Sequence, residues 1–196
     1  MEIEKILQIR YVKLHFTLKM LEDTILPRNK VSALRGGMGE MLLRANCIRD
    51  RKCEKCDFLS ECIVQRTMYS KMEIQPGFMQ KGDSAGYVLE CENYDEIFYQ
   101  GEKLNFQLIL FGKNIVYLNQ YLQAFAYLGM EGLGKHKAKY IVESVTNTQN
   151  MKLVEGDSVY KKNYKIHTVA EYVQYRMNSD QKEDTIVFHT PMTVKY

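Results

Sequence analysis

A strict alternation of apolar and polar residues marks the chain between residues 9 and 19. Its apolar members are Val12, Leu14, Phe16 and Leu18, and its polar members are Tyr11, Lys13, His15, Thr17 and Lys19. Successive side chains of a β-strand point to opposite faces of a sheet. The alternation therefore predicts a strand with one buried face and one polar face.

Two later segments repeat apolar residues at helical spacing. The first covers residues 31–45 after Asn29, and the second covers residues 115–128 after Asn114. Both asparagines are suitable N-caps, and Gly129 is the expected C-cap of the second helix. A cluster of glycines at 36, 37 and 39 interrupts the first helix, where each glycine costs up to ~1 kcal/mol relative to alanine. The cluster indicates either very close packing against this helix or an irregular stretch.

Three more strands are expected at residues 86–91, 104–111 and 138–146. The order strand, helix, strand, strand, helix, strand predicts an α+β, ferredoxin-like domain over residues 1–147. The same four-stranded sheet is the platform of RNA-recognition domains, although a fold alone does not fix a function. Residues 148–196 are expected to form a hairpin and an extension that begins a second domain. The alternative for the apolar stretch 184–196 is an edge strand of the first sheet.

Composition narrows the class of protein. The chain has 196 residues, and its 27 Lys+Arg against 24 Asp+Glu give a net charge of only +3, which excludes a histone-like coat of positive charge. The basic residues nevertheless concentrate at 28–35, 49–55, 135–139 and 161–176, the last interleaved with tyrosines. No apolar run approaches the ~18–20 residues that span a membrane. The charged N-terminus lacks a secretory segment, so we expect a cytoplasmic protein with reduced thiols.

Four of the five cysteines lie close together, at Cys47, Cys53, Cys56 and Cys62. Their spacing, C-x5-C-x2-C-x5-C, predicts a tetrahedral zinc site, and a site with four protein ligands is structural rather than catalytic. An iron–sulfur cluster is the other metal interpretation, but the spacing differs from that of bacterial ferredoxins. The alternative without a metal is four free thiols in a loop.

A second candidate site is the glycine-rich segment 132–140. Glycine lets a backbone approach a phosphate closely, and Lys135, Lys137 and Lys139 would project on one side if a strand begins here. The alternative is a helix C-cap followed by a solvated strand edge. The segment lacks the Gly-Lys-Ser/Thr ending of a Walker motif.

Four motifs follow one another in a fixed order along most of the chain. They are Leu-Arg-Gly-Gly-Met-Gly-Glu-Met-Leu at 34–42, the cysteine cluster, the glycine-rich region 129–140, and Phe-His-Thr-Pro-Met at 188–192. Together they resemble the CRISPR repeat-processing endoribonucleases of the RAMP superfamily, in the branch with a four-cysteine insert.

The resemblance implies two tandem ferredoxin-like domains and metal-independent cleavage of precursor CRISPR RNA within its repeats. The 2′-hydroxyl would attack the adjacent phosphate and leave a cyclic phosphate, which needs a base and a nearby cation. The family's catalytic histidine often lies near the first helix, yet residues 20–46 contain none. The candidate bases are therefore His15 and His136.

The resemblance also implies RNA contacts for Gly132, Gly134, Lys135 and Lys137, and Lys139 belongs to the same segment. The candidate phosphate ligands near the first helix are Arg28, Lys30 and Arg35.

Three functions follow from these patterns. The first is a repeat-processing endoribonuclease or its N-terminal part. The second is a non-catalytic RAMP subunit that holds crRNA in an effector complex. The third is a zinc-stabilised protein-interaction module without RNA. The expected partners of the first two are repeat RNA, other CRISPR-associated proteins and a second copy of the chain, with no membrane.

Overall fold

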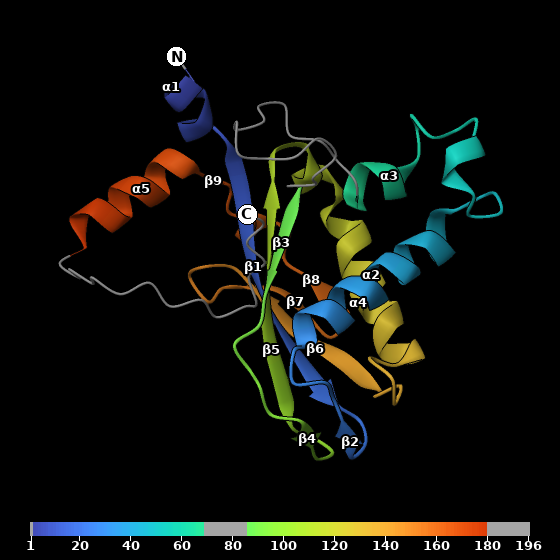
Figure 1. Cartoon of the computed structure of the whole chain (residues 1–196). Helices are drawn as coiled ribbons and strands as arrows, with labels where there is room; N and C mark the ends of the chain where they lie inside the picture. The colour runs from blue at the N-terminus through green and yellow to red at the C-terminus, as the bar shows by residue number, and fades with distance from the viewer. Residues whose placement is uncertain (1, 69–85, 180–196) are drawn as a thin grey trace, which may run out of the picture.

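The computed structural model describes residues 2–68 and 86–179, and its centre is an antiparallel sheet with two helices on one face (Figure 1). Four strands form the middle of this sheet in the order β3-β5-β1-β6. Their bounds are Tyr87–Glu90 for β3, Lys103–Phe111 for β5, Arg10–Met20 for β1 and Tyr140–Thr146 for β6. Helix α2 (Lys30–Asn46) follows β1, and helix α4 (Leu118–Glu131) follows β5. The predicted α+β, ferredoxin-like arrangement is confirmed, because each neighbouring pair of these strands is antiparallel.

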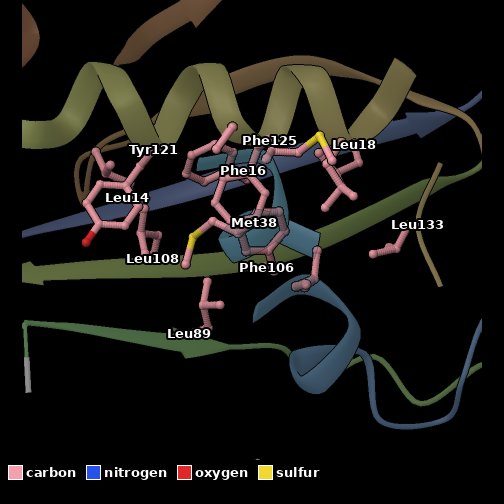
Figure 2. Close-up of a cluster of buried hydrophobic side chains, with 14 of the residues drawn as sticks. Leu14, Phe16, Leu18, Met38, Leu89, Phe106, Leu108, Tyr121, Phe125 and Leu133 are labelled. Atoms are coloured by element: carbon pink, nitrogen blue, oxygen red, sulfur yellow. The ribbon is translucent and has the colours of Figure 1, made fainter. Parts of the chain in front are cut away.

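The alternation along β1 separates core from surface as predicted. Its apolar side chains are at most 2% exposed and face the helices. Figure 2 shows the centre of this core, where Phe16 stacks on Phe106 of β5 with ring centroids 4.7 Å apart. Phe125 of α4 lies 5.1 Å from the first ring and 4.8 Å from the second. Each such buried side chain stabilises the fold by about 1.5–3 kcal/mol. The polar residues of β1 are half-buried on the other side of the sheet, which we call the opposite face.

The glycines of α2 are explained by close packing, because the helix is continuous from Lys30 to Asn46. A Cβ atom on Gly37 would lie 2.6 Å from the methyl carbons of Leu128 in α4. A Cβ atom on Gly39 would lie 2.9 Å from the terminal methyl of Met68, in helix α3 (Ile63–Met68). Two of the three glycines therefore let neighbouring helices approach the α2 backbone.

The helix starts follow the sequence in one case only. The side chain of Asn29 caps α2 by accepting the Val31 N–H at 3.2 Å, as predicted. The predicted N-cap role of Asn114 is wrong. A 3-10 turn, η2 (Gly112–Tyr117), precedes α4, and Asn114 is buried within it, with its amide nitrogen 3.4 Å from the Tyr121 hydroxyl.

The end of α4 also differs from the prediction. The helix continues through Gly129 to Glu131, and its C-cap is Gly132, whose N–H donates to the Leu128 carbonyl at 2.7 Å. Gly129 is needed for packing instead, because a Cβ there would lie 2.3 Å from the carbonyl oxygen of Tyr140. The following strand starts at residue 140 rather than 138, because residues 134–137 form a turn.

The sheet continues past residue 147, the expected domain boundary. The predicted hairpin is present and pairs with β6, and a further short strand pairs with the start of β1. These elements are β7 (Lys152–Glu155), β8 (Ser158–Val159), η3 (Lys161–Asn163), β9 (His167–Thr168) and α5 (Val169–Asn178). The strand expected at 184–196 and the motif at 188–192 lie outside the described residues, so a second domain stays a prediction.

Several short elements complete the fold. They are α1 (Glu2–Leu7), β2 (Thr24–Ile25), η1 (Cys53–Lys55) and β4 (Ile97–Phe98). Strands β2 and β4 pair with each other in a separate two-stranded sheet at one end of the molecule (Figure 1). Among the described helices, none combines the length and apolar character that a membrane span requires.

Candidate nucleic-acid interface

The glycine-rich segment forms a closed turn that presents cations. Leu133 and Ala138 pair through two backbone hydrogen bonds of 2.9 and 3.0 Å, and the Lys137 N–H donates to the Gly134 carbonyl at 3.3 Å. Leu133 and Ala138 are buried, so the base of the turn belongs to the core. The residues at its tip, 135–137, are exposed. We call residues 132–138 the lysine turn.

Two glycines determine the shape of the lysine turn. Gly132 has φ +97°, and a Cβ there would lie 2.2 Å from the Lys137 carbonyl oxygen. Gly134 has φ +72°, and a Cβ atom there would lie 3.5 Å from the ring carbon Cδ of Pro27. Such φ values favour glycine over residues with a side chain. The contact with Pro27 brings the turn beside the start of α2, next to the exposed Arg28.

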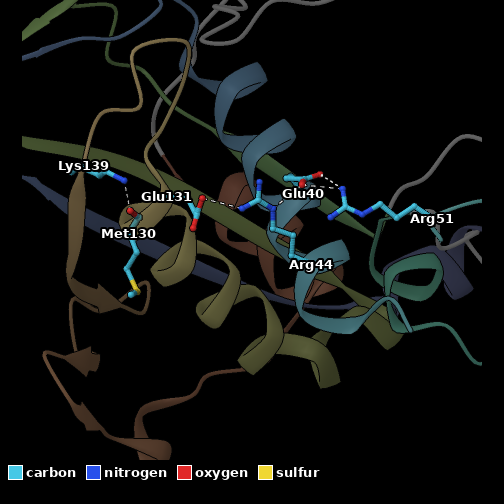
Figure 3. Close-up of polar contacts among 6 residues, drawn as sticks. All are labelled: Glu40, Arg44, Arg51, Met130, Glu131 and Lys139. Atoms are coloured by element: carbon cyan, nitrogen blue, oxygen red, sulfur yellow. Dashed lines mark hydrogen bonds and ion pairs between the residues drawn. The ribbon is translucent and has the colours of Figure 1, made fainter. Parts of the chain in front are cut away.

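The ammonium groups of two candidate RNA ligands, Lys139 and Lys30, donate hydrogen bonds to backbone carbonyls of the protein itself. The ammonium of Lys139 donates to the Met130 carbonyl near the end of α4 (Figure 3). Lys30 is only 1% exposed and donates to the carbonyl of Asp95, with the Pro27 carbonyl at 3.3 Å. Its burial lowers the pKa of its ammonium. The expectation that Lys30 contacts RNA is wrong, because its side chain is buried and its ammonium bonds two backbone carbonyls in the interior.

Arg35 is exposed on α2 but lies away from the lysine turn. Its Nε donates to the Tyr87 hydroxyl at 3.2 Å. Tyr87 belongs to β3, and β5 and β1 lie between β3 and β6 in the sheet. Of the predicted phosphate ligands, Lys135 and Lys137 share the lysine turn, Arg28 follows the proline that faces this turn, and Arg35 lies elsewhere.

The two candidate bases do not share a site. His15 lies on the opposite face and pairs in register with Thr146, the last residue of β6. His136 lies in the turn that precedes β6. The seven residues of β6 therefore separate the two histidines by about 20 Å.

His15 has an environment suited to a neutral base. Burial is the main cause that lowers the pKa of its imidazole, and the ammonium of Lys13 lowers this pKa further. Lys13 lies on the same face two residues earlier and forms a 3.4 Å ion pair with Glu90 of β3. The alternation of β1 already put this imidazole and this cation on one face, and the ion pair of Lys13 with Glu90 is what the sequence did not indicate.

Another feature of the opposite face was missed altogether. The ring of His167 in β9 lies 5.6 Å from the ring of Tyr11, because these residues are register partners. The Nε2 atom of His167 lies 3.3 Å from the Thr148 hydroxyl, and its Nδ1 lies 3.6 Å from the Glu171 carboxylate. The only sequence signal was the mixture of tyrosines and basic residues at 161–176, since a two-residue strand leaves no periodicity.

The four clustered cysteines all carry free thiols, at the end of α2 and in the following loop. Within residues 2–68 and 86–179, no three His, Cys, Asp or Glu side chains are placed to hold a metal ion. The loop is instead tied to α2 by Arg51, which bonds Glu40 at 3.0 Å (Figure 3). Arg44 bonds the same carboxylate at 2.8 Å and Glu131 of α4 at 2.9 Å. The geometry does not gather the thiols into a zinc site, so zinc stays a prediction.

Comparisons with known proteins give a family match and several distant likenesses to solved structures. The family model AF_1859_N, described as an N-terminal domain, matches residues 7–171. No curated protein matches the chain significantly.

Of the solved structures, a chain of the Csm3–Csm4 subcomplex of the type III-A CRISPR-Cas interference complex is 12% identical, with a TM-score of 0.45. That match covers 86% of this chain and 95% of that chain. A CRISPR-associated protein Cas6 is 9% identical, with a TM-score of 0.36, over 81% of this chain and 62% of that chain. Likenesses this distant assign neither a function nor a partner.

Proposed function

This chain belongs to the AF_1859_N family, and we propose that it binds RNA, with the repeat of a CRISPR transcript as its substrate. The observation that carries the proposal is the lysine turn, in which two exposed lysines project from a rigid base beside Arg28. The order of sequence motifs, which resembles the RAMP endoribonucleases, supplies the identity of the RNA.

The lysine turn suits the backbone of RNA rather than its bases. Lys135 and Lys137 are long, exposed cations that can neutralise phosphates without reading sequence. The turn holds their α-carbons in place, because Gly132, Gly134 and Lys137 itself adopt the positive φ values that it needs and its base is buried. Because the backbone of the turn is already ordered, it has little backbone freedom to lose when RNA binds, which favours affinity.

Metal-independent cleavage is a second proposal, favoured by His15 beside Lys13 on the opposite face. In this reaction a base takes the proton of a 2′-hydroxyl, and that oxygen attacks the adjacent phosphorus. The bond from phosphorus to the 5′ oxygen breaks, a proton returns to the leaving oxygen, and the products are a 2′,3′-cyclic phosphate and a 5′-hydroxyl. A neutral His15 can act as the base, and the Lys13 ammonium can stabilise the pentacoordinate phosphorane.

The test uses labelled repeat RNA and the full chain in EDTA. We expect the logarithm of the association constant for RNA to fall linearly with the logarithm of salt concentration. We also expect cleavage to a cyclic phosphate, which His15→Ala should abolish. His136→Ala is the matched histidine variant and should still cleave the RNA that it binds, because His136 lies about 20 Å from His15. Failure to bind repeat RNA at low salt would contradict the proposed function. Binding without cleavage would leave RNA binding in place and favour a crRNA-holding subunit, for which other CRISPR-associated proteins are the proposed partners.

We also propose structural zinc at Cys47, Cys53, Cys56 and Cys62. The support is their spacing and their place in one continuous loop with free thiols. Elemental analysis of purified protein is expected to give about one zinc per chain, lost when Cys53 and Cys56 are both replaced by serine. Cys91→Ser is the control, because this buried thiol lies outside the loop. Iron with visible absorbance, or no metal at all, would contradict the zinc proposal.

A further inference from the structure

The small sheet formed by β2 and β4 exposes apolar side chains to solvent. Ile25 and Ile97 are cross-strand partners, 53% and 61% exposed. Leu21 and Tyr99 flank them along the two segments and are 44% and 60% exposed. We call residues 21–25 and 92–102 the end ribbon. Scattered surface apolar residues are ordinary, but a contiguous group on paired strands marks an interaction surface.

The end ribbon is held rigidly, so its apolar residues are not exposed by a loose loop. Phe98, which alternates with Ile97, is only 3% exposed and lies under the Lys30 ammonium, 5.4 Å from its ring centre. The Leu26 N–H donates to the Glu96 carbonyl at 2.8 Å, and the Gly101 N–H donates to the Met20 carbonyl at 2.8 Å. The ribbon is thus fastened both to the start of α2 and to the end of β1.

A negatively charged groove opens beside the exposed isoleucine of β4. It has a volume of about 580 Å³, and its lining includes Ile97, Asp95, Glu96 and Glu102. The one lysine in its lining, Lys103, forms a 2.6 Å ion pair with Glu143 of β6. The Lys30 ammonium lies against the Asp95 carbonyl beneath the groove, and among the described residues the three carboxylates still exceed this one cation.

The charge of the groove restricts what can cover the apolar pair. RNA and anionic lipid headgroups would be repelled by the three carboxylates. A protein segment that carries lysine or arginine would be attracted, and an aliphatic side chain of the same segment would bury Ile25 and Ile97. We propose that the end ribbon docks a basic segment of a partner protein through an aliphatic side chain adjacent to lysine or arginine. The proposal does not rest on RNA binding, because the lysine turn contributes no residue to the groove or to the exposed isoleucine pair.

The test measures amide chemical shifts of the full chain during titration with a short synthetic peptide that alternates lysine with leucine. We expect shifts concentrated in residues 21–25 and 92–102. A peptide that alternates lysine with serine, and one that alternates glutamate with leucine, should bind at least about tenfold more weakly. If the lysine–serine peptide bound as tightly as the lysine–leucine peptide, charge alone would explain the binding, and the proposal would be overturned.

Two pairs of substitutions locate the site. Each double variant should lower the affinity for the lysine–leucine peptide about tenfold and leave the affinity for repeat RNA unchanged. The first variant is Ile25→Ser with Ile97→Ser, and the second is Glu96→Gln with Glu102→Gln. Val116→Ser and Glu54→Gln are the matched controls, at an exposed valine and an exposed glutamate elsewhere.

Three results would overturn the proposal. The first is unchanged peptide affinity in both variants. The second is displacement of the bound lysine–leucine peptide by repeat RNA. The third is that the same amides shift when the concentration of the protein alone is raised. Such shifts would assign the surface to a second copy of the chain.

Discussion

Replacing Gly132 by alanine is expected to destabilise the protein by about 3 kcal/mol or more. The backbone there has φ +97° and ψ +138°, a region that residues with a side chain rarely adopt. The added Cβ would also stand 2.2 Å from a backbone carbonyl oxygen, that of Lys137, which cannot rotate away. Both the end of α4 and the lysine turn would have to shift.

Urea unfolding followed by circular dichroism measures this loss as a lower midpoint at unchanged slope. Gly36→Ala is the matched control, since Gly36 lies inside α2 with no atom within 4 Å of the added Cβ. This control is expected to stabilise the protein by up to about 1 kcal/mol, because alanine is the better helix former. A Gly132→Ala protein as stable as the natural one would show that the turn does not depend on this glycine.

The elements that the sequence predicted well are those with a long internal period. Ten residues of β1, from Tyr11 to Met20, alternate without a break, and the buried stripes of α2 and α4 repeat over several turns. The short strands β2, β4 and β9 have two residues each, which is too few for any period. Their pairing depends on segments far apart in the chain, as when Arg10 and Tyr11 meet Thr168 and His167.

The sequence errors at helix ends have a common physical cause. Gly129 and Gly132 both suit a C-cap by residue type, and tertiary packing decides between them. Gly129 lies where the backbone of Tyr140 in β6 approaches the helix, so it is needed inside α4. Asn114 suits an N-cap equally well, yet it is buried against Tyr121 after a 3-10 turn. Residue type therefore limits which residues can cap a helix, but contacts between distant segments determine which residue does.

The candidate site shows the same limit for charged residues. Arg28, Lys30, Lys135 and Lys139 look equivalent in the sequence, because each is a cation near a turn or a helix start. The structure distinguishes them by the carbonyl groups around them. Lys30 meets the Asp95 carbonyl in the interior, and Lys139 meets the Met130 carbonyl at the end of α4. A lysine that satisfies buried or terminal carbonyls cannot be told from a phosphate ligand until the chain is folded.

Removing the two exposed cations of the lysine turn, by Lys135→Ala with Lys137→Ala, is expected to weaken repeat-RNA binding at least about tenfold near 0.1 M salt. If each lysine neutralises one phosphate of single-stranded RNA, the slope of log affinity against log salt should fall by about 1.4. The fold should be retained, because both side chains are exposed and the glycines that shape the turn remain. Filter binding across a salt series, with urea unfolding of the same protein, measures all three quantities.

The control for this double variant is Lys161→Ala with Lys162→Ala. It removes the same charge from an exposed 3-10 turn beyond β8, away from the lysine turn. An equal loss of affinity in both double variants would mean that RNA responds only to the net charge of the protein, and the lysine turn would lose its role. A loss confined to Lys135 and Lys137 together with a smaller salt slope would instead require phosphates at that turn, since removing a remote charge leaves the number of released counterions unchanged. The slope therefore discriminates where affinity alone does not, because misfolding lowers the active fraction without changing the salt dependence of the molecules that still bind.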